Sequence, residues 1–239
     1  MDTMPAAVLE KLGDWGYKKV ELPTCSDDDV IVQTKISGIC STDVMRSMKT
    51  GFYHYPIIPG HEFCGIVVNK GKNVDNIDVD DFVAVYPLIP CKKCGSCTSG
   101  NFNLCSNYSF LGSRTHGGYA EHVLCPKESM IKIPQGVTFE EASLTEPLAV
   151  ALHAAKIAGK ATNVAIMGLG PIGLLVAQWV RAMGAKTILG VDRNENRFSI
   201  AKAIGIDHCV DTREQQAAAH IHELTGGDGA DIVFECSGS

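Results

Sequence analysis

The stretch Asn163-Val-Ala-Ile-Met-Gly-Leu-Gly-Pro-Ile-Gly173 decides the fold of the C-terminal half of the chain. A short apolar run, typical of a buried strand, leads directly into Gly-x-Gly-x-x-Gly and then into an apolar helix-forming segment. In this pattern Gly168 makes the turn, Gly170 lets the backbone approach a pyrophosphate, and Gly173 packs the helix on the strand. Because the N-terminus of the helix then faces the anion, the stretch predicts a dinucleotide site. The alternative is that the glycines only turn the chain.

Strands and helices alternate along the rest of this half. The expected strands are 163–167, 186–191, 208–210 and 232–236, and the expected helices are 171–183, 195–204 and 217–224. This order predicts a parallel, doubly wound sheet. Asp192 ends the second strand, 24 residues after Gly168, where a carboxylate accepts hydrogen bonds from the adenine ribose and repels a 2′-phosphate. NAD is therefore favoured over NADP, although Arg193 leaves NADP open.

The N-terminal half has a different pattern, in which short β-type runs are broken by Gly, Pro and Asp. The expected strands are 30–36, 63–68, 82–86 and 119–124, which predict a compact β domain. Thr138-Phe-Glu-Glu141 is a capping box, and 142–157 is predicted to be a connecting helix that Pro147 bends or breaks. We therefore expect a β-rich domain over 1–155 and an α/β domain over 156–239.

Four of the ten cysteines have the spacing of a metal site. Cys91, Cys94, Cys97 and Cys105 form Cys-x2-Cys-x2-Cys-x7-Cys, in which gaps of two residues aim successive thiolates at a shared centre and the longer gap returns a fourth. We expect a structural zinc. An iron–sulfur cluster uses a similar run, but with a last gap of about three residues and a following proline, whereas Ser106 follows here. Four free thiols are a poor alternative, because reduced cysteines are usually buried singly.

Composition excludes several classes of protein. The chain has 239 residues, 21 Lys and Arg against 27 Asp and Glu, and 45% hydrophobic residues, which indicates a globular rather than a disordered protein. A net charge of −6 without a basic cluster argues against nucleic acid as the partner, so a zinc-ribbon nucleic-acid module is the weaker alternative. No apolar run of about 18 residues and no signal-peptide pattern is evident, so we expect a cytoplasmic protein without membrane contact.

A second group of candidate metal ligands lies in the β-rich half. Cys40 and His61 follow glycines, at Gly38-Ile-Cys40 and Gly60-His61, and Glu62 and Glu146 add carboxylates. Thiolate, imidazole and carboxylate all bind zinc. The spacing alone does not show that these segments converge, and a lone Cys, His or Glu is more often structural.

The whole chain resembles the medium-chain, zinc-dependent alcohol dehydrogenases. The motifs that carry the resemblance are GICSTD, PGHEFCG, the four-cysteine lobe, GGYAEH, TEPLAVALHA, GLGPIG and VDRNENR. The resemblance implies a GroES-like β domain that holds a catalytic zinc and a structural-zinc lobe at about 88–110, followed by a Rossmann domain for NAD. Two zincs per chain and hydride transfer from a secondary alcohol to NAD are the corresponding expectations. The joint presence of Cys40, His61 and Glu146 argues against a zinc-independent reductase of this fold, which needs none of the three.

The resemblance also implies roles for individual residues. Cys40 and His61 would bind the catalytic zinc, Glu62 would be a direct or exchanging ligand, and Glu146 would stand where alcohol-specific members have cysteine, as in the polyol branch. Asp43 would orient His61. Thr42 matches the proton-relay hydroxyl, but Met45 replaces the relay histidine of many relatives. The positions that match NAD contacts of sorbitol dehydrogenases are Ile172, Asp192 and Arg197.

The substrate class also follows from resemblance. The segments 53–56, 87–91 and 110–114 are similar to galactitol-1-phosphate 5-dehydrogenases, so a sugar alcohol or its phosphate is expected. Arg114 is a hypothetical phosphate contact, with a structural or solvent-facing role as the alternative. Sorbitol, 2,3-butanediol and L-threonine dehydrogenases share the glutamate pattern and stay open.

A complete dinucleotide fold has six strands, whereas the sequence stops at Ser239, after the fourth expected strand. We therefore expect a C-terminally truncated copy, whose Rossmann domain is incomplete. The alternative to an enzyme is a non-catalytic fragment that keeps the zinc lobe and part of the nucleotide site. For the full-length form, the resemblance implies a small-molecule substrate as partner and a homodimer or homotetramer.

Overall fold

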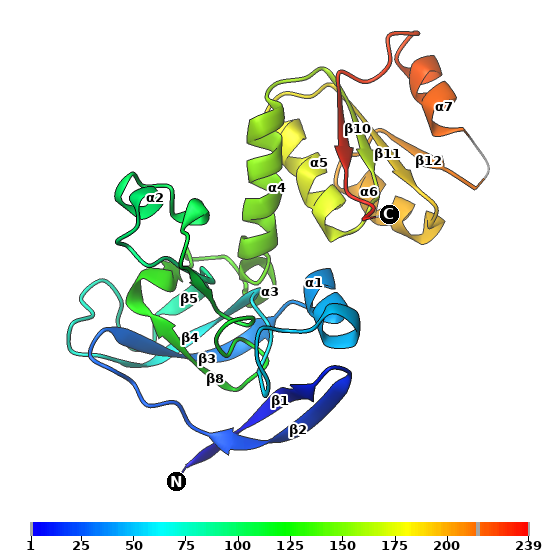
Figure 1. Cartoon of the computed structure of the whole chain (residues 1–239). Helices are drawn as coiled ribbons and strands as arrows, with labels where there is room; N and C mark the ends of the chain where they lie inside the picture. Colours follow the sequence, from blue (N-terminus) through cyan, green and yellow to red (C-terminus); the bar gives the residue numbers. More distant parts are fainter. Residues whose placement is uncertain (1, 214–215, 239) are drawn as a thin grey trace. The chain divides into compact units, whose positions relative to one another are not determined.

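The computed structural model describes residues 2–213 and 216–238 (Figure 1). The predicted end of the Rossmann domain at Ser239 therefore lies outside the described residues. The chain divides into two compact units, Met1–Glu146 and Pro147–Ser239. The expected boundary at 155/156 and this division both fall within one helix, α4 (Thr145–Ala158).

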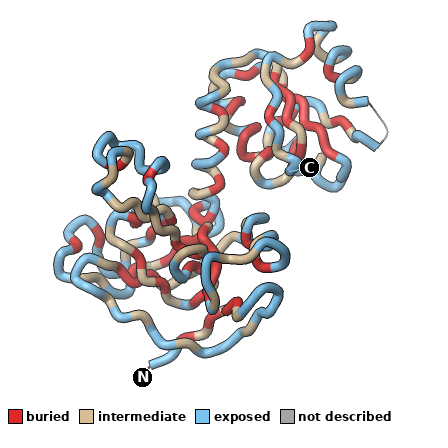
Figure 2. Tube along the Cα trace, viewed as in Figure 1, coloured by how far each residue is buried: buried red, intermediate tan, exposed pale blue. Residues whose placement is uncertain are grey.

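A five-stranded antiparallel sheet forms the centre of the N-terminal unit. Its order is β8 (His122–Pro126), β3 (Asp29–Ser37), β4 (Phe63–Lys70), β5 (Phe82–Val85) and β9 (Met130–Lys132). Alternate side chains of these strands, such as Val30, Val32 and Val67, are fully buried and make the core of the unit (Figure 2). This confirms the expected β domain, although the strand expected at 119–124 begins only at His122.

Smaller elements surround this sheet. The hairpin of β1 (Thr3–Lys11) and β2 (Asp14–Glu21) and the short pair of β6 (Leu88–Ile89) and β7 (Ser109–Phe110) were not expected from the sequence. The helical segments are α1 (Ser41–Met45), the π-helix η1 (Arg46–Thr50), α2 (Gly95–Thr98), the 3-10 turns η2 (Phe102–Leu104) and η3 (Lys127–Ser129), and α3 (Phe139–Ala142).

The expected connecting helix 142–157 is two helices, α3 and α4, and the break comes before Pro147 rather than at it. The capping box at Thr138 and Glu141 is present and starts α3. Pro147 lies in the first turn of α4, where a backbone N–H has no partner within the helix, so the proline does not interrupt α4.

A four-stranded parallel sheet forms the centre of the C-terminal unit, in the order β12 (His208–Asp211), β11 (Thr187–Asp192), β10 (Asn163–Met167) and β13 (Ile232–Glu235). The strands alternate with α5 (Pro171–Ala182), the 3-10 turn η4 (Glu195–Arg197) with α6 (Phe198–Ala203), and α7 (Ala217–Leu224). This order confirms the doubly wound α/β prediction. Buried Val164 and Ile166 of β10 pack against Val176 and Val180 of α5, which places the loop 168–170 at the carboxyl end of β10. No helix of the described ranges meets the length and apolarity that a membrane span requires.

Candidate metal and dinucleotide sites

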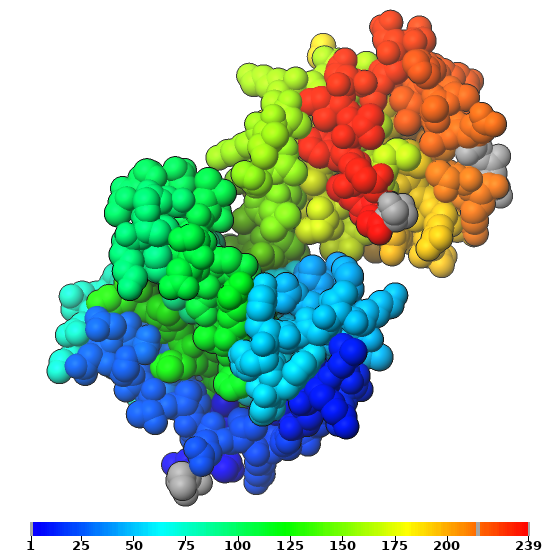
Figure 3. Space-filling model, in the orientation of Figure 1, coloured from blue at the N-terminus to red at the C-terminus, as the bar shows by residue number. Residues whose placement is uncertain are grey.

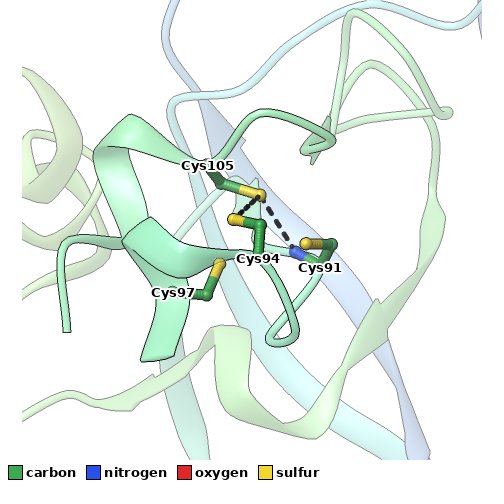
Figure 4. Close-up of side chains that lie close together, drawn as sticks. All are labelled: Cys91, Cys94, Cys97 and Cys105. Carbon is green, nitrogen blue, oxygen red and sulfur yellow. Dashed lines mark hydrogen bonds between the residues drawn. The ribbon is translucent and has the colours of Figure 1, made fainter. Parts of the chain in front are cut away.

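The four cysteines singled out by their spacing come together in one lobe of the N-terminal unit (Figure 4). Their sulfur atoms all lie within 4.8 Å of one another. Cys94 Sγ is 3.9 Å from Cys105 Sγ, and the backbone N–H of Cys91 donates to Cys105 Sγ at 3.2 Å. Lys92, with a φ of 59°, makes the left-handed turn that returns the chain toward Cys94.

The electrostatics of the lobe suit a metal that binds thiolates. Backbone N–H groups of Cys97 and Ser106 lower the pKa of Cys94 to about 5. Those of Lys93 and Cys94 lower the pKa of Cys91. Burial and the neighbouring thiols act in the opposite direction on Cys97 and raise its pKa to about 12. Four sulfurs gathered within 4.8 Å, with N–H groups that favour the deprotonated form at Cys91 and Cys94, match the donor set of a tetrahedral structural zinc.

A second cluster joins two segments of the N-terminal unit. Possible ligand atoms of Cys40, His61 and Glu62 lie within 4.8 Å of one another. Cys40 precedes the first turn of α1, and His61 and Glu62 immediately precede β4. A thiolate, an imidazole and a carboxylate in this arrangement fit the protein ligands of a zinc site.

Two glycines make room for this cluster. A Cβ on Gly38 would lie 2.4 Å from Oε2 of Glu62, and the N–H of Gly38 donates to the backbone oxygen of Glu62 at 2.6 Å. Gly60 has a φ of 95°, and a Cβ there would lie 2.5 Å from the ring of Tyr119. The glycines before Cys40 and His61 are therefore required by close approach of side chains, and not only by turn geometry.

Hydrogen bonds hold His61 in place. Its Nδ1 lies 3.3 Å from Oδ1 of buried Asp43, which leaves Nε2 as the ring nitrogen available to a metal. The Tyr119 hydroxyl donates to Oδ2 of Asp43 at 2.9 Å. Burial acts to lower the pKa of His61, but the hydrogen bonds that the imidazole donates to Asp43 and Cys40, together with the charges of these two residues, outweigh burial and raise it to about 10. The pocket therefore favours positive charge at this position.

The remaining predicted residues of this site lie around the cluster. Burial raises the pKa values of both Glu62 and Glu146. The charge of His61 acts in the opposite direction on both carboxyl groups but does not outweigh burial. Glu146 is thus an electrostatic neighbour of the cluster but does not belong to the group within 4.8 Å. The exposed Thr42 hydroxyl donates to Cys40 Sγ at 3.1 Å.

In the C-terminal unit the three motif glycines have different surroundings. Gly168 has a φ of 97°, and a Cβ there would lie 2.6 Å from the backbone nitrogen of Ser237. A Cβ on Gly173 would lie 2.0 Å from the carbonyl oxygen of Gly168, so α5 packs directly on the turn. Gly170, which precedes α5, has no atom within 4 Å of such a position. The space in front of the helix N-terminus is open, which fits a pyrophosphate.

Asp192 lies at the end of β11 and is already bonded within the chain. Its Oδ2 accepts from the N–H of Leu169 at 2.8 Å and from Arg197 Nη1 at 2.9 Å, and its Oδ1 accepts from the N–H of Asn194. Burial acts to raise the pKa of Asp192, but these donors outweigh it and lower the pKa. The ionised carboxylate is thus fixed beside the glycine turn. Ile172 is half-buried and packs against the core, so its side chain is partly structural.

Sequence reasoning missed several residues near the Cys40 cluster. Tyr119 was expected only as part of a strand, although its motif was noticed. The ring of Phe110 packs edge-on against His61, with ring centroids 5.7 Å apart. The guanidinium groups of Arg46 and Arg114 both lie over the aromatic ring of Tyr53. No local signal marks these contacts, because the residues come from separate loops.

Two protein-family models match the chain. The alcohol dehydrogenase GroES-like domain matches residues 26–135, and the zinc-binding dehydrogenase model matches residues 171–239. The expected GroES-like and Rossmann-type domains are thereby confirmed, in agreement with the two units of the structure.

Known proteins are similar over the whole chain. Sorbitol dehydrogenase 2 of Saccharomyces cerevisiae is 34% identical over 249 residues, which cover 98% of this chain and 70% of the relative. The structure of galactitol-1-phosphate dehydrogenase from Escherichia coli is 32% identical with a TM-score of 0.91, covering 98% of this chain and 69% of that one. A protein described as a zinc-binding dehydrogenase from Sinorhizobium meliloti 1021, bound to NADP, is 32% identical with a TM-score of 0.92, covering 100% and 71%.

Proposed function

Because the chain belongs to the zinc-dependent medium-chain polyol dehydrogenases, we propose that it oxidises a secondary hydroxyl of a sugar alcohol or sugar-alcohol phosphate with NAD. The alcohol loses a hydride to the nicotinamide and a proton to solvent, and a ketone and NADH result. The observation that carries the proposal is the convergence of Cys40 with His61 and Glu62, which come from a second segment of the chain.

The residues of this site fit zinc, with Cys40 Sγ, His61 Nε2 and Glu62 as ligands and Glu146 close by. When bound, zinc supplies a Lewis acid that polarises the substrate hydroxyl, and NAD supplies the hydride acceptor. Asp43 holds the imidazole ring so that Nε2 faces the cluster. With the four-cysteine lobe, the chain would hold two zincs.

The proton of the substrate hydroxyl needs a route that does not depend on a histidine at position 45, where Met45 stands. Thr42 is the candidate, because its Oγ1 lies 3.1 Å from Cys40 Sγ and its side chain is exposed. We assign the first proton transfer to this hydroxyl, with water as the next acceptor.

The nucleotide site favours NAD, because the ionised Asp192 carboxylate is fixed where the adenine ribose is expected and would repel a 2′-phosphate. The Sinorhizobium relative binds NADP, so the two coenzymes need a direct comparison. We further propose a cytoplasmic enzyme that acts on small molecules and, in its full-length form, is a homodimer or homotetramer.

The test measures zinc per chain by elemental analysis and reduction of NAD and NADP with sorbitol, galactitol, 2,3-butanediol, L-threonine and the hexitol phosphates. We expect two zincs and turnover of a polyol or its phosphate with NAD. Cys40→Ala should lose one zinc and all turnover, whereas Cys125→Ala, at a buried cysteine outside both clusters, should lose neither. Turnover that survives Cys40→Ala, or oxidation of none of these compounds, would contradict the proposal.

A further inference from the structure

Two arginines converge on one tyrosine in the N-terminal unit. The guanidinium carbon of Arg114 lies 3.9 Å from the ring centroid of Tyr53 and 4.5 Å from that of Tyr108. The guanidinium carbon of Arg46 lies 5.0 Å from the same Tyr53 ring and 5.9 Å from that of Phe52. These contacts hold both guanidinium groups over the Tyr53 ring, and Arg46 and Arg114 also form hydrogen bonds with the tyrosine side chains around them.

No carboxylate of residues 2–213 and 216–238 lies within 4.0 Å of either guanidinium group. Nε of Arg114 is buried and has no hydrogen-bond partner in the same part of the chain. A buried donor without a partner is costly, and two like charges held near one ring repel each other. Both costs would be offset by an anion that binds between the two guanidinium groups.

The arginine pair is connected to the metal cluster through short stretches of chain. Arg46 follows Cys40 by six residues through α1 into η1, a rise of about 9 Å along a helix. Arg114 donates its backbone N–H to the carbonyl oxygen of Phe110, whose ring packs on His61. Figure 3 shows the segment that contains Arg46 and Tyr53, in light blue, at the surface of this unit. An anion here would lie beside the reacting centre and be reachable from solvent.

The electrostatics of Tyr53 support this placement. Hydrogen bonds with Arg46 and Tyr108, together with the charge of Arg114, lower the pKa of Tyr53 to about 8. The surroundings of its hydroxyl therefore favour a negatively charged oxygen. Two guanidinium groups match a dianion better than a single negative charge, which favours a phosphate monoester over a carboxylate.

We propose that Arg46 and Arg114, held on the ring of Tyr53, bind the phosphate group of a polyol phosphate and so select phosphorylated over unphosphorylated substrates. This inference rests on the proposed polyol dehydrogenase function and names the substrate class of the same site. Arg114 was a hypothetical phosphate contact from sequence, but Arg46 and Tyr53 had no assigned role there. The structure adds the second charge and the aromatic platform.

The test compares kcat/KM for galactitol 1-phosphate with that for galactitol in the zinc-loaded protein, for wild type, Arg114→Gln and Arg46→Gln. Loss of one charge-assisted contact should lower the preference for the phosphate on the order of 10- to 100-fold. Arg114→Lys keeps the positive charge but loses the planar guanidinium group that stacks on the rings. Its preference for the phosphate should therefore lie between those of wild type and Arg114→Gln. Lys49→Gln removes a positive charge from the same helix η1 and should leave the preference unchanged.

Calorimetric titration with galactitol 1-phosphate separates this inference from the proposed function, because binding needs no turnover. We expect wild type to bind the phosphate ester more tightly than galactitol. Each Arg→Gln variant should remove most of this difference in affinity. Its zinc content and melting temperature should stay as in wild type. If both variants keep the wild-type difference, the arginines do not bind the phosphate. L-idonate, a polyol carboxylate, is the comparison ligand. If its affinity exceeds that of galactitol by as much as the affinity of the phosphate ester does, the assignment to phosphate is wrong.

Discussion

The hydroxyl of Tyr119 lies 2.9 Å from one oxygen of Asp43, and the other oxygen of Asp43 lies 3.3 Å from Nδ1 of His61. Burial and the negative charge of Asp43 both raise the pKa of Tyr119, so the phenol stays protonated and donates. Its hydrogen bond fixes the rotation of the Asp43 carboxylate, which in turn fixes the imidazole ring. We therefore predict that Tyr119 is a positioning residue for His61, the expected metal ligand.

Tyr119→Phe should weaken zinc binding at the Cys40 cluster about 10-fold and leave the four-cysteine lobe unchanged, because outer residues of this kind contribute 10- to 100-fold to metal affinity. Competition with a chromophoric chelator, which resolves zinc at the two proposed sites, measures this. The spectrum of the cobalt-substituted protein should also change at this site. Phenylalanine keeps the ring that packs beside Gly60, so a loss of folding is not expected.

Tyr17→Phe is the matched control, since Tyr17 is 82% exposed and lies on β2. Equal zinc affinities in Tyr119→Phe and wild type would show that Asp43 holds His61 without help from the tyrosine.

The sequence predicted which residues come together where the spacing is local. The spacing of Cys91, Cys94, Cys97 and Cys105 contains the geometry of the lobe, because a turn of two residues can place two sulfurs together. Tyr119 could not be found this way, since its partner Asp43 is 76 residues away and the contact depends on the whole β domain. The same holds for Arg46 and Arg114.

Among the elements, the junction of β10 and α5 places two glycines under opposite constraints. A Cβ at Gly173 would meet the backbone oxygen of Gly168 at 2.0 Å, whereas a Cβ at Gly170 would meet nothing. Because backbone cannot move aside cheaply, Gly173 is required by packing. The protein itself would tolerate a side chain at Gly170, but that side chain would occupy the space where the pyrophosphate is expected.

Gly173→Ala should therefore lower the melting temperature by several degrees, as expected for about 1–3 kcal/mol of overpacking. Gly170→Ala should keep the wild-type melting temperature but weaken NADH binding at least 10-fold. Calorimetry and the fluorescence of bound NADH measure the two effects. A Gly170→Ala protein that binds NADH as tightly as wild type would show that the coenzyme does not approach this backbone.

Elements with a periodic apolar pattern were predicted, and those without one were missed. Strands β10 and β11 are buried runs between glycine turns, and the capping box marks the start of α3. The β1–β2 hairpin was missed because Pro5 argues against a strand and because most side chains of β2 are exposed. The helix break before Thr145 was placed at Pro147, since a proline inside a helical pattern usually ends it.

In the molecule as a whole, the two units have separate hydrophobic cores. Val30, Val67 and Val83 belong to the core of the N-terminal unit, and Ile166 and Val176 belong to that of the C-terminal unit. Both clusters of metal ligands lie within Met1–Glu146, and the glycine turn and Asp192 lie within Pro147–Ser239. We therefore expect each unit to have its own ligand, zinc in the first and the nucleotide in the second, which should stabilise that unit by binding its folded form.

Hydrogen–deuterium exchange with and without ligands measures this division of stability. Removal of zinc should speed amide exchange in the lobe at 88–110 and around 38–63, because metal binding holds these loops in their folded arrangement. Strands β10 to β13 should exchange at an unchanged rate. Addition of NADH to the zinc-free protein should slow exchange at 167–173 and 192–197 without restoring the lobe. Equal acceleration in both sheets on zinc removal would mean that the units unfold as one, and that their separate cores do not give separate stabilities.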